Sequence, residues 1–181
     1  MNLRTRFYRT FFYWTAPAPT QDALQRTGLI VTMSWRKNRD GTPGPGNLIL
    51  AQVATAWSLC FEHKPVFPTE EVSSSMPTEI PRAGIVSGAE DTFDAARIQA
   101  EYCHEHEIRS VMVVAHPLHM NRVIWTFERL GIRALPALMP TDYALYQGSD
   151  LKHFTARHHW FAFWLREAFL ARPVYLLQGK I

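Results

Sequence analysis

The segment from Ile108 to Leu130 constrains the fold more than any other part of the sequence. It begins with Val111-Met112-Val113-Val114, an apolar run without polar alternation, which is typical of a strand buried on both faces. Beyond this run, Val123, Phe127 and Leu130 recur at helical spacing. The segment therefore predicts a buried strand followed directly by an amphipathic helix, which is the repeating unit of α/β proteins.

The two ends of this helix carry residues that suit helix termini. Pro117 fits the first helical position, where a missing N–H does no harm, and Gly131 fits the left-handed residue that follows a helix. His116, His119 and Arg122 crowd the junction between strand and helix, and the last two share a helix face. Because the free amides of a first helical turn favour an anion, we expect a site here.

The rest of the chain alternates in the same way between strand-like and helix-like segments. We expect further strands over 28–33, 64–68 and 132–138, and further helices over 47–61, 92–106 and 151–173. This alternation predicts an α/β fold, a three-layer sandwich around a mainly parallel sheet. We assign residues 1–27 to an aromatic and basic N-terminal arm and residues 28–181 to a single domain.

Two helix starts offer polar side chains. Asn47 is the expected N-cap of the helix that follows the first strand. For the helix near 92–106 three caps are open: Ser87 with Glu90 in capping-box spacing, or Asp91, or Thr92. The expected buried faces are Leu48, Ala51, Thr55 and Leu59 for the first helix, and Phe93, Ala96, Ala100 and Cys103 for the second.

Composition excludes several functional classes. Hydrophobic residues make up 47% and charged residues 19%, as in a globular protein. The net charge of +3, without a dense basic run among aromatics, argues against a nucleic-acid partner. Cys60 and Cys103 lie in predicted helices, so we expect two buried free thiols and no disulfide.

No segment has the length to span a membrane. The arm's apolar stretch, Phe11 to Trp14, is also too short for a signal-peptide core. We expect a cytoplasmic protein, with the periplasm as the alternative if the arm follows a removed signal. The helix over 151–173 is apolar on all sides, which favours burial under the arm or a homodimer through this helix.

The histidine-rich segments do not predict a metal. Cys103-His104-Glu105-His106 stands at a helix end, where its side chains point in different directions, and no second ligand pair matches it. His116 and His119 lack an obvious third ligand. We therefore predict no metal site.

Further polar residues are candidates for the pocket beside His116. Thr92 and Asp94 open a helix, and Glu70 follows the second strand at the edge where ligands bind in open α/β sheets. Ser87 and Asn47, at the starts of helices, are included as ligand-binding candidates. Each has a plainer interpretation, as a cap or a solvated side chain. The loop SWRKNRDGTPGPG contains neither G-x-G-x-x-G nor a Walker motif, so it is a weak nucleotide signal.

The run VMVVAHPLHMNRVIWTFERLGI resembles the YdcF-like family, to which SanA and ElyC belong. Members carry a hydrophobic strand, a polar turn and His-Met-x-Arg at the start of a helix, here His119 to Arg122. Thr92-Phe93-Asp94-Ala95 is similar to the family's Thr-x-(Glu/Asn)-Ala helix opening, and Trp164 to Pro173 to its Leu-Arg-Glu helix. The resemblance implies a Rossmann-like fold, links to bacterial envelope metabolism, and a nucleotide-like ligand such as S-adenosylmethionine.

The chain departs from that family at two turns. A glycine-rich turn usually follows the family's first strand, where this chain has Thr32-Met33-Ser34-Trp35. Ser-Gly-Gly usually follows the second, where this chain has Phe67-Pro68-Thr69-Glu70. Half of the expected ligand pocket therefore differs from the family's.

Three hypotheses follow. In the first, the domain binds, and hydrolyses or transfers, a phosphorylated or nucleotide-like small molecule. Arg122 would pair with the anion, and His119 or His116 would act as general acid or base. Thr92 and Asp94 would orient the ligand, or Asp94 would take part in catalysis by polarising a histidine. In the second, the domain is a non-catalytic envelope-associated or regulatory binding module. In the third, the site is purely structural: His116 bonds a backbone carbonyl and Arg122 bonds an acid.

Overall fold

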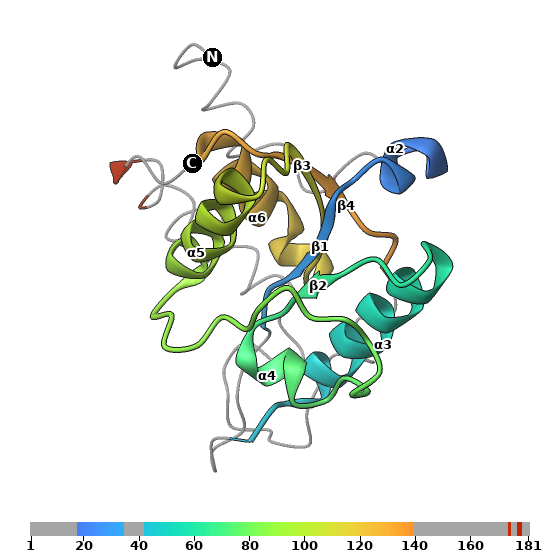
Figure 1. Cartoon of the computed structure of the whole chain (residues 1–181). Coiled ribbons are helices and arrows are strands. Elements are labelled where there is room, and N and C mark those ends of the chain that lie inside the picture. The colour runs from blue at the N-terminus through green and yellow to red at the C-terminus, as the bar shows by residue number, and fades with distance from the viewer. Residues whose placement is uncertain (1–17, 35–41, 140–173, 175–176, 179–181) are drawn as a thin grey trace.

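The computed structural model describes residues 18–34, 42–139, 174 and 177–178, and the account below is confined to them (Figure 1). Four strands form one parallel sheet in the order β2-β1-β3-β4. Their bounds are β1 Leu29–Thr32, β2 Val66–Phe67, β3 Ser110–Val114 and β4 Arg133–Pro136. The expected mainly parallel sheet is confirmed.

The two central strands are buried on both faces. In the register of β1 and β3, Leu29 pairs with Val111 and Thr32 with Val114. The side chains of β1 are buried throughout, and so are Val111 to Val114. The unalternated apolar run in the sequence therefore does mark a strand covered on both sides.

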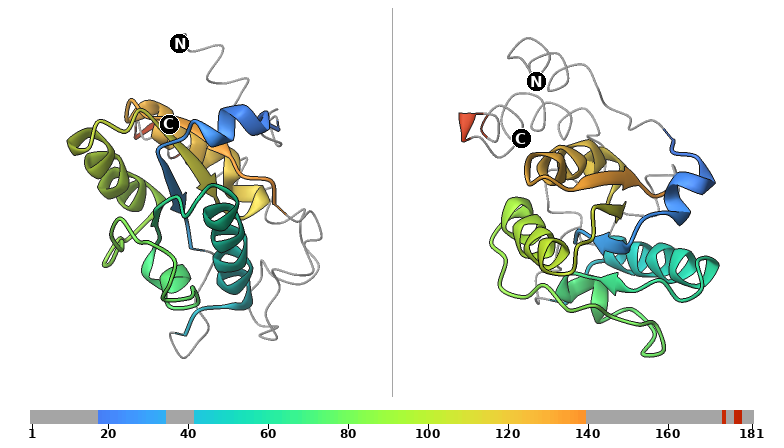
Figure 2. Two further views of the ribbon diagram at one scale, coloured as in Figure 1. Left: turned by 45° about the vertical axis from the view of Figure 1, so that its right-hand side comes forward. Right: turned by 45° about the horizontal axis from the view of Figure 1, so that its top comes forward.

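Helices cover the two faces of the sheet in separate layers (Figure 1, Figure 2). One face packs α5 (Thr92–Glu105) and α6 (Pro117–Arg129) against odd-numbered strand residues such as Val31 and Val113. The other packs α3 (Pro45–Cys60) against even-numbered residues such as Ile30 and Met112. Two short helices, α2 (Gln21–Gln25) and α4 (Glu70–Ser73), contribute Leu24 and Val72 to that second layer. The α/β three-layer arrangement is confirmed.

The strand order creates a topological switch point between β1 and β3. The chain leaves the end of β1 toward α3 on one face, and leaves the end of β3 toward α6 on the opposite face. Because all four strands are parallel, their carboxyl ends meet at one edge of the sheet. In open α/β sheets, ligands bind outside this edge, where neighbouring connections diverge.

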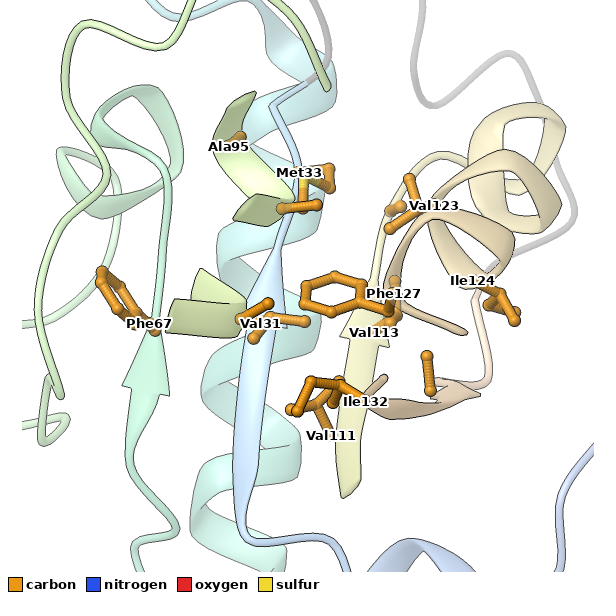
Figure 3. Packing of buried hydrophobic residues seen from close by; sticks show 14 of the residues in the cluster. Val31, Met33, Phe67, Ala95, Val111, Val113, Val123, Ile124, Phe127 and Ile132 are labelled. Carbon is orange, nitrogen blue, oxygen red and sulfur yellow. The ribbon is translucent and has the colours of Figure 1, made fainter. Parts of the chain in front are cut away.

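The helix α6 has the core face and the end that its sequence predicts. Val123 and Phe127 are fully buried, and Phe127 lies beside Val31 and Val113 (Figure 3). At its end, Gly131 has φ +82°, and the N–H of Ile132 donates to the carbonyl of Phe127 at 3.0 Å. This is the Schellman geometry, in which a residue with positive φ closes the helix and an apolar pair covers the turn.

The predicted start of α3 is wrong, and of its predicted buried face Ala51 is buried but Leu48 and Leu59 are exposed. The helix begins at Pro45 with Gly44 as N-cap, so Asn47 is a buried residue within it and not the cap. Leu48 and Leu59 are 46% and 52% exposed, and the buried residues are Gly46, Asn47, Leu50, Ala51, Ala54 and Ser58. The physical reason is that the helix contains no charged residue, so its sequence lacks the polar contrast that marks an outer face.

Lys64 ties the short helix α2 to the domain. Its Nζ donates to the carbonyls of Leu24 at 3.2 Å, Gln25 at 2.8 Å and Thr27 at 2.5 Å, and lies 4.8 Å from the centre of the Phe61 ring. Burial lowers the pKa of Lys64. A cation at a helix C-terminus satisfies carbonyls that have no partner within the helix.

Several predictions concern residues outside the described part of the chain. These are residues 1–17 of the arm predicted over 1–27, the aromatic helix over 151–173, and the homodimer through that helix. None of the helices in the described ranges has the length and apolarity needed to cross a lipid bilayer.

Both thiols are free, but only Cys103 is buried. The prediction that Cys60 is also buried is wrong, because Cys60 lies at the exposed last position of α3.

Candidate functional site

Three side chains from two helices meet at the carboxyl edge of the sheet. The Oγ1 atom of Thr92, the first residue of α5, lies 3.0 Å from Nε2 of His119 in the first turn of α6. The Nη2 atom of Arg122, one turn further along α6, lies 2.8 Å from the same nitrogen. We call Thr92, His119 and Arg122 the imidazole cluster.

The imidazole cluster fixes the protonation state of its ring. A guanidinium can only donate hydrogen bonds, so Nε2 of His119 must accept the bond from Arg122. Nε2 then carries no proton, and the hydroxyl of Thr92 also donates to it. The imidazole is therefore neutral, with its proton on Nδ1.

Asp91 sets the position of Thr92. The carboxylate of Asp91 accepts hydrogen bonds from the N–H groups of Phe93 at 2.7 Å and Asp94 at 3.0 Å, and so caps α5. Of the three caps that the sequence leaves open, the structure has Asp91. Because Thr92 does not serve as the cap, its hydroxyl contacts α6 instead.

His116 positions the start of α6 through its backbone. Its carbonyl accepts hydrogen bonds from the N–H groups of His119 at 2.8 Å and Met120 at 3.0 Å, which places it at the entry to the helix before Pro117. His116 and His119 are only 4% and 6% exposed, whereas Arg122 is half-buried. Arg122 is therefore more open to solvent than either histidine.

The remaining candidate residues are distributed around this edge. Asp94 is half-buried in the first turn of α5, beside Thr92. Asn47 is buried near the start of α3, in the opposite helical layer. Glu70, whose N–H donates to the carbonyl of Val86 at 2.9 Å, and Ser87 are exposed at the end of β2. Since β1 separates β2 from β3 in the sheet, Glu70 and Ser87 lie one strand away from the start of α6.

The sequence interpretation missed a buried glutamine. Gln99 of α5 is completely buried, and its Nε2 donates to the carbonyls of Thr32 at 3.2 Å and Phe67 at 2.7 Å. It thereby links the carboxyl ends of β1 and β2. The available signal was its place between Ala96 and Cys103 on the apolar face of the helix, where a polar residue needs internal partners.

The Cys103 to His106 segment does not form a ligand cluster. His104 Nε2 lies 2.9 Å from the carbonyl of Leu130, while the His106 ring stacks on Tyr102 with its centroid 3.9 Å away. Burial raises the pKa of Cys103 to about 11, which disfavours the thiolate that a zinc ion requires. Within the described ranges, no group of three or more His, Cys, Asp or Glu residues is arranged to hold a metal.

Known proteins offer no match to this chain. No protein-family model, no curated protein and no solved structure matches it. The chemistry of the imidazole cluster is therefore argued from its own side chains.

Proposed function

We propose that the domain binds a phosphorylated or nucleotide-like small molecule at the carboxyl edge of its sheet, with the imidazole cluster as the anion-binding centre. The observation that carries this proposal is the position of a guanidinium and a neutral imidazole at the start of α6, beside the switch point between β1 and β3. Ligands of open α/β sheets bind at such switch points.

Two features support an anionic ligand. Arg122 presents a planar set of N–H donors, which matches the oxygen atoms of a phosphate or carboxylate better than an ammonium would. The first turn of α6 adds the positive end of the helix dipole, while the N–H groups of His119 and Met120 are taken up by the carbonyl of His116. Both features favour a negative group at the same end of the helix.

His119 supplies a proton acceptor for hydrolysis or group transfer. An anion that binds Arg122 competes for the N–H that Nε2 of His119 accepts. Nε2 then keeps only the bond from the Thr92 hydroxyl. Once this hydroxyl rotates to accept instead, Nε2 takes a proton from water or from a substrate hydroxyl, as a general base does. The hydroxyl of Thr92 orients the ring in this role, Asp94 orients the ligand, and His116 is the second imidazole of the site.

The resemblance to the YdcF-like family supports the same ligand class. His119 to Arg122 correspond to the family's His-Met-x-Arg segment, and Thr92 to Ala95 to its helix opening. On this basis we include S-adenosylmethionine and adenosine monophosphate (AMP) among the ligands to test.

A second candidate function is non-catalytic binding, in an envelope-associated or regulatory role. The observation that favours it is the burial of both histidines, which are 4% and 6% exposed. Only the half-buried Arg122 then meets the ligand, and His119 holds its guanidinium in place. Binding without turnover is the expected behaviour in this case.

The test is a thermal-shift titration of the full chain with inorganic phosphate, AMP and S-adenosylmethionine. A ligand that binds the folded state raises Tm with its concentration. We expect a shift that Arg122→Gln abolishes and that Arg129→Gln, an exposed arginine on the same helix, leaves intact. A shift retained in Arg122→Gln contradicts the proposal. Turnover of p-nitrophenyl phosphate, lost in His119→Gln, separates catalysis from binding alone.

A further inference from the structure

The outer face of α3 carries no charge. The helix lies on the side of the sheet opposite to α5 and α6 (Figure 2). None of its residues is charged, and its exposed residues are Pro45, Leu48, Gln52, Ala56, Leu59 and Cys60. Leu48 and Leu59 are 46% and 52% exposed. Because contact between apolar surface and water is unfavourable, an exposed surface of this kind marks an interaction site.

The other two long helices in the described part of the chain have ordinary outer faces. α5 exposes Arg97 and Glu101, and α6 exposes Glu128 and Arg129. The chain therefore places charges where these helices meet water, and α3 departs from this pattern. A partner for α3 must itself lack charge at the contact, because an unpaired charge buried against this face would lose its hydration.

The exposed face of α3 is centred on Gln52. Leu48 and Ala56 stand four residues before and after Gln52, and Pro45 and Leu59 stand seven residues before and after it, all on one side of the helix. If two copies of α3 cross antiparallel about a two-fold axis at Gln52, Leu48 of each copy lies opposite Ala56 of the other. A large side chain then meets a small one, which lets the two helices approach closely.

Gln52 is a side chain that can pair with its own copy. An amide group has both hydrogen-bond donors and an acceptor, so two Gln52 side chains at a two-fold axis can bond to each other. A lysine or glutamate at this position would meet its own like charge across the axis. The chemistry of the exposed face therefore fits a second copy of this chain.

We propose that the outer face of α3 is the interface of a homodimer, in which two copies of α3 pack antiparallel about a two-fold axis at Gln52. A helix of 16 residues is about 24 Å long, so its contact is small beside the roughly 800 Å² per partner of a standard interface. The dimer is accordingly weak, and its population rises with protein concentration.

The first test is sedimentation of the full chain over a series of concentrations. We expect the mass of the wild type to rise from monomer toward dimer. Ala56→Glu places a carboxylate against Leu48 of the partner and should raise Kd by about 100-fold. Because Ala56 is exposed in the monomer, the carboxylate is hydrated there and the circular dichroism spectrum should stay unchanged. Arg129→Gln, the control, changes the net charge equally but on α6, and should leave Kd unchanged.

The second test is a cross-link at the two-fold axis. Gln52→Cys in a Cys60→Ser background brings two thiols together, so mild oxidation should give a disulfide-linked dimer on a non-reducing gel. The matched control is Glu101→Cys in the same background, which places a thiol on the exposed face of α5. This control should remain monomeric. The cross-link tests the same interface even if Ala56→Glu does not fold.

Three outcomes overturn the proposal. The first is a wild type that stays monomeric over the whole concentration series; if Ala56→Glu then lowers Tm, another segment of the same chain covers α3. The second is a dimer whose Kd is the same in Ala56→Glu and in the wild type. The third is a Gln52→Cys variant that forms no more disulfide-linked dimer than Glu101→Cys. The last two would assign the dimer to another surface.

Discussion

The guanidinium of Arg122 lies 2.8 Å from Nε2 of His119, and this contact determines which nitrogen of the imidazole carries the proton. Because the guanidinium cannot accept a hydrogen bond, the ring is held neutral with its proton on Nδ1. The contact joins two residues one turn apart on α6, and Thr92 of α5 also contacts the ring. A bound anion has to compete with it.

The tautomer of His119 is open to direct measurement. We expect the ¹⁵N spectrum of the imidazole near neutral pH to show a protonated Nδ1 and an unprotonated Nε2. Arg122→Gln removes the obligatory donor, so the ring is expected to populate both tautomers. Arg129→Gln should leave the spectrum of His119 unchanged. A protonated Nε2 in the wild type would contradict the geometry.

Asp91 is expected to stabilise the start of α5. Its carboxylate accepts from two backbone N–H groups, and the loss of an N-cap costs about 1–2 kcal/mol. Asp91→Ala should lower the free energy of unfolding by this amount in urea denaturation. Ser87→Ala is the control, since the exposed Ser87 is not the cap and should change stability little. A larger loss of stability in Ser87→Ala than in Asp91→Ala would assign the cap to Ser87.

The two thiols are expected to differ in reactivity. Burial raises the pKa of Cys103 to about 11, so near pH 8 only about one molecule in a thousand carries its thiolate. Cys60 is exposed. Iodoacetamide should therefore label Cys60 in the folded protein and both residues in urea, as mass spectrometry can show. Labelling of Cys103 in the folded state would contradict its burial.

The raised pKa of Cys103 also predicts how the stability of the protein depends on pH. The Cys103 thiol stays protonated in the folded state up to about pH 11, whereas the ordinary pKa of a thiol is 9.0. Between these values the unfolded chain binds fewer protons, so the contribution of this thiol to stability is complete below pH 9 and is lost as the pH rises toward 11. Cys103→Ala should make the fall in Tm over this range less steep. If Tm falls with pH equally steeply in Cys103→Ala and in the wild type, groups other than this thiol cause the fall.

Lys64 is expected to hold residues 24–27 to the domain. Lys64→Met keeps an apolar stem but removes the donor to three backbone carbonyls, which lowers the free energy of unfolding by about 1–3 kcal/mol. Amide hydrogen exchange should become faster over 21–27. The control is Arg109→Met, which removes an exposed cation just before β3 and should leave this exchange unchanged. Unchanged exchange in Lys64→Met would show that α2 is held by Leu24 alone.

The sequence by itself determined the parts of this protein that depend on local pattern. The apolar run of β3, Pro117 at the start of α6, and Gly131 after its end predicted one strand and one helix with correct positions. Their periodicity and their termini are properties of neighbouring residues. The spacing of His119 and Arg122 likewise predicted that they share a face, and they do make contact.

Only the tertiary structure decided which distant residues meet. Nothing local in the uncharged helix α3 showed which face is buried, and the sheet selected the side that carries Asn47 and Ser58. Likewise, Thr92 reaches His119, and Gln99 reaches the ends of β1 and β2, only because the strand order packs α5 beside α6 on one face. Such contacts depend on how whole elements pack, which the spacing of residues along one helix does not encode.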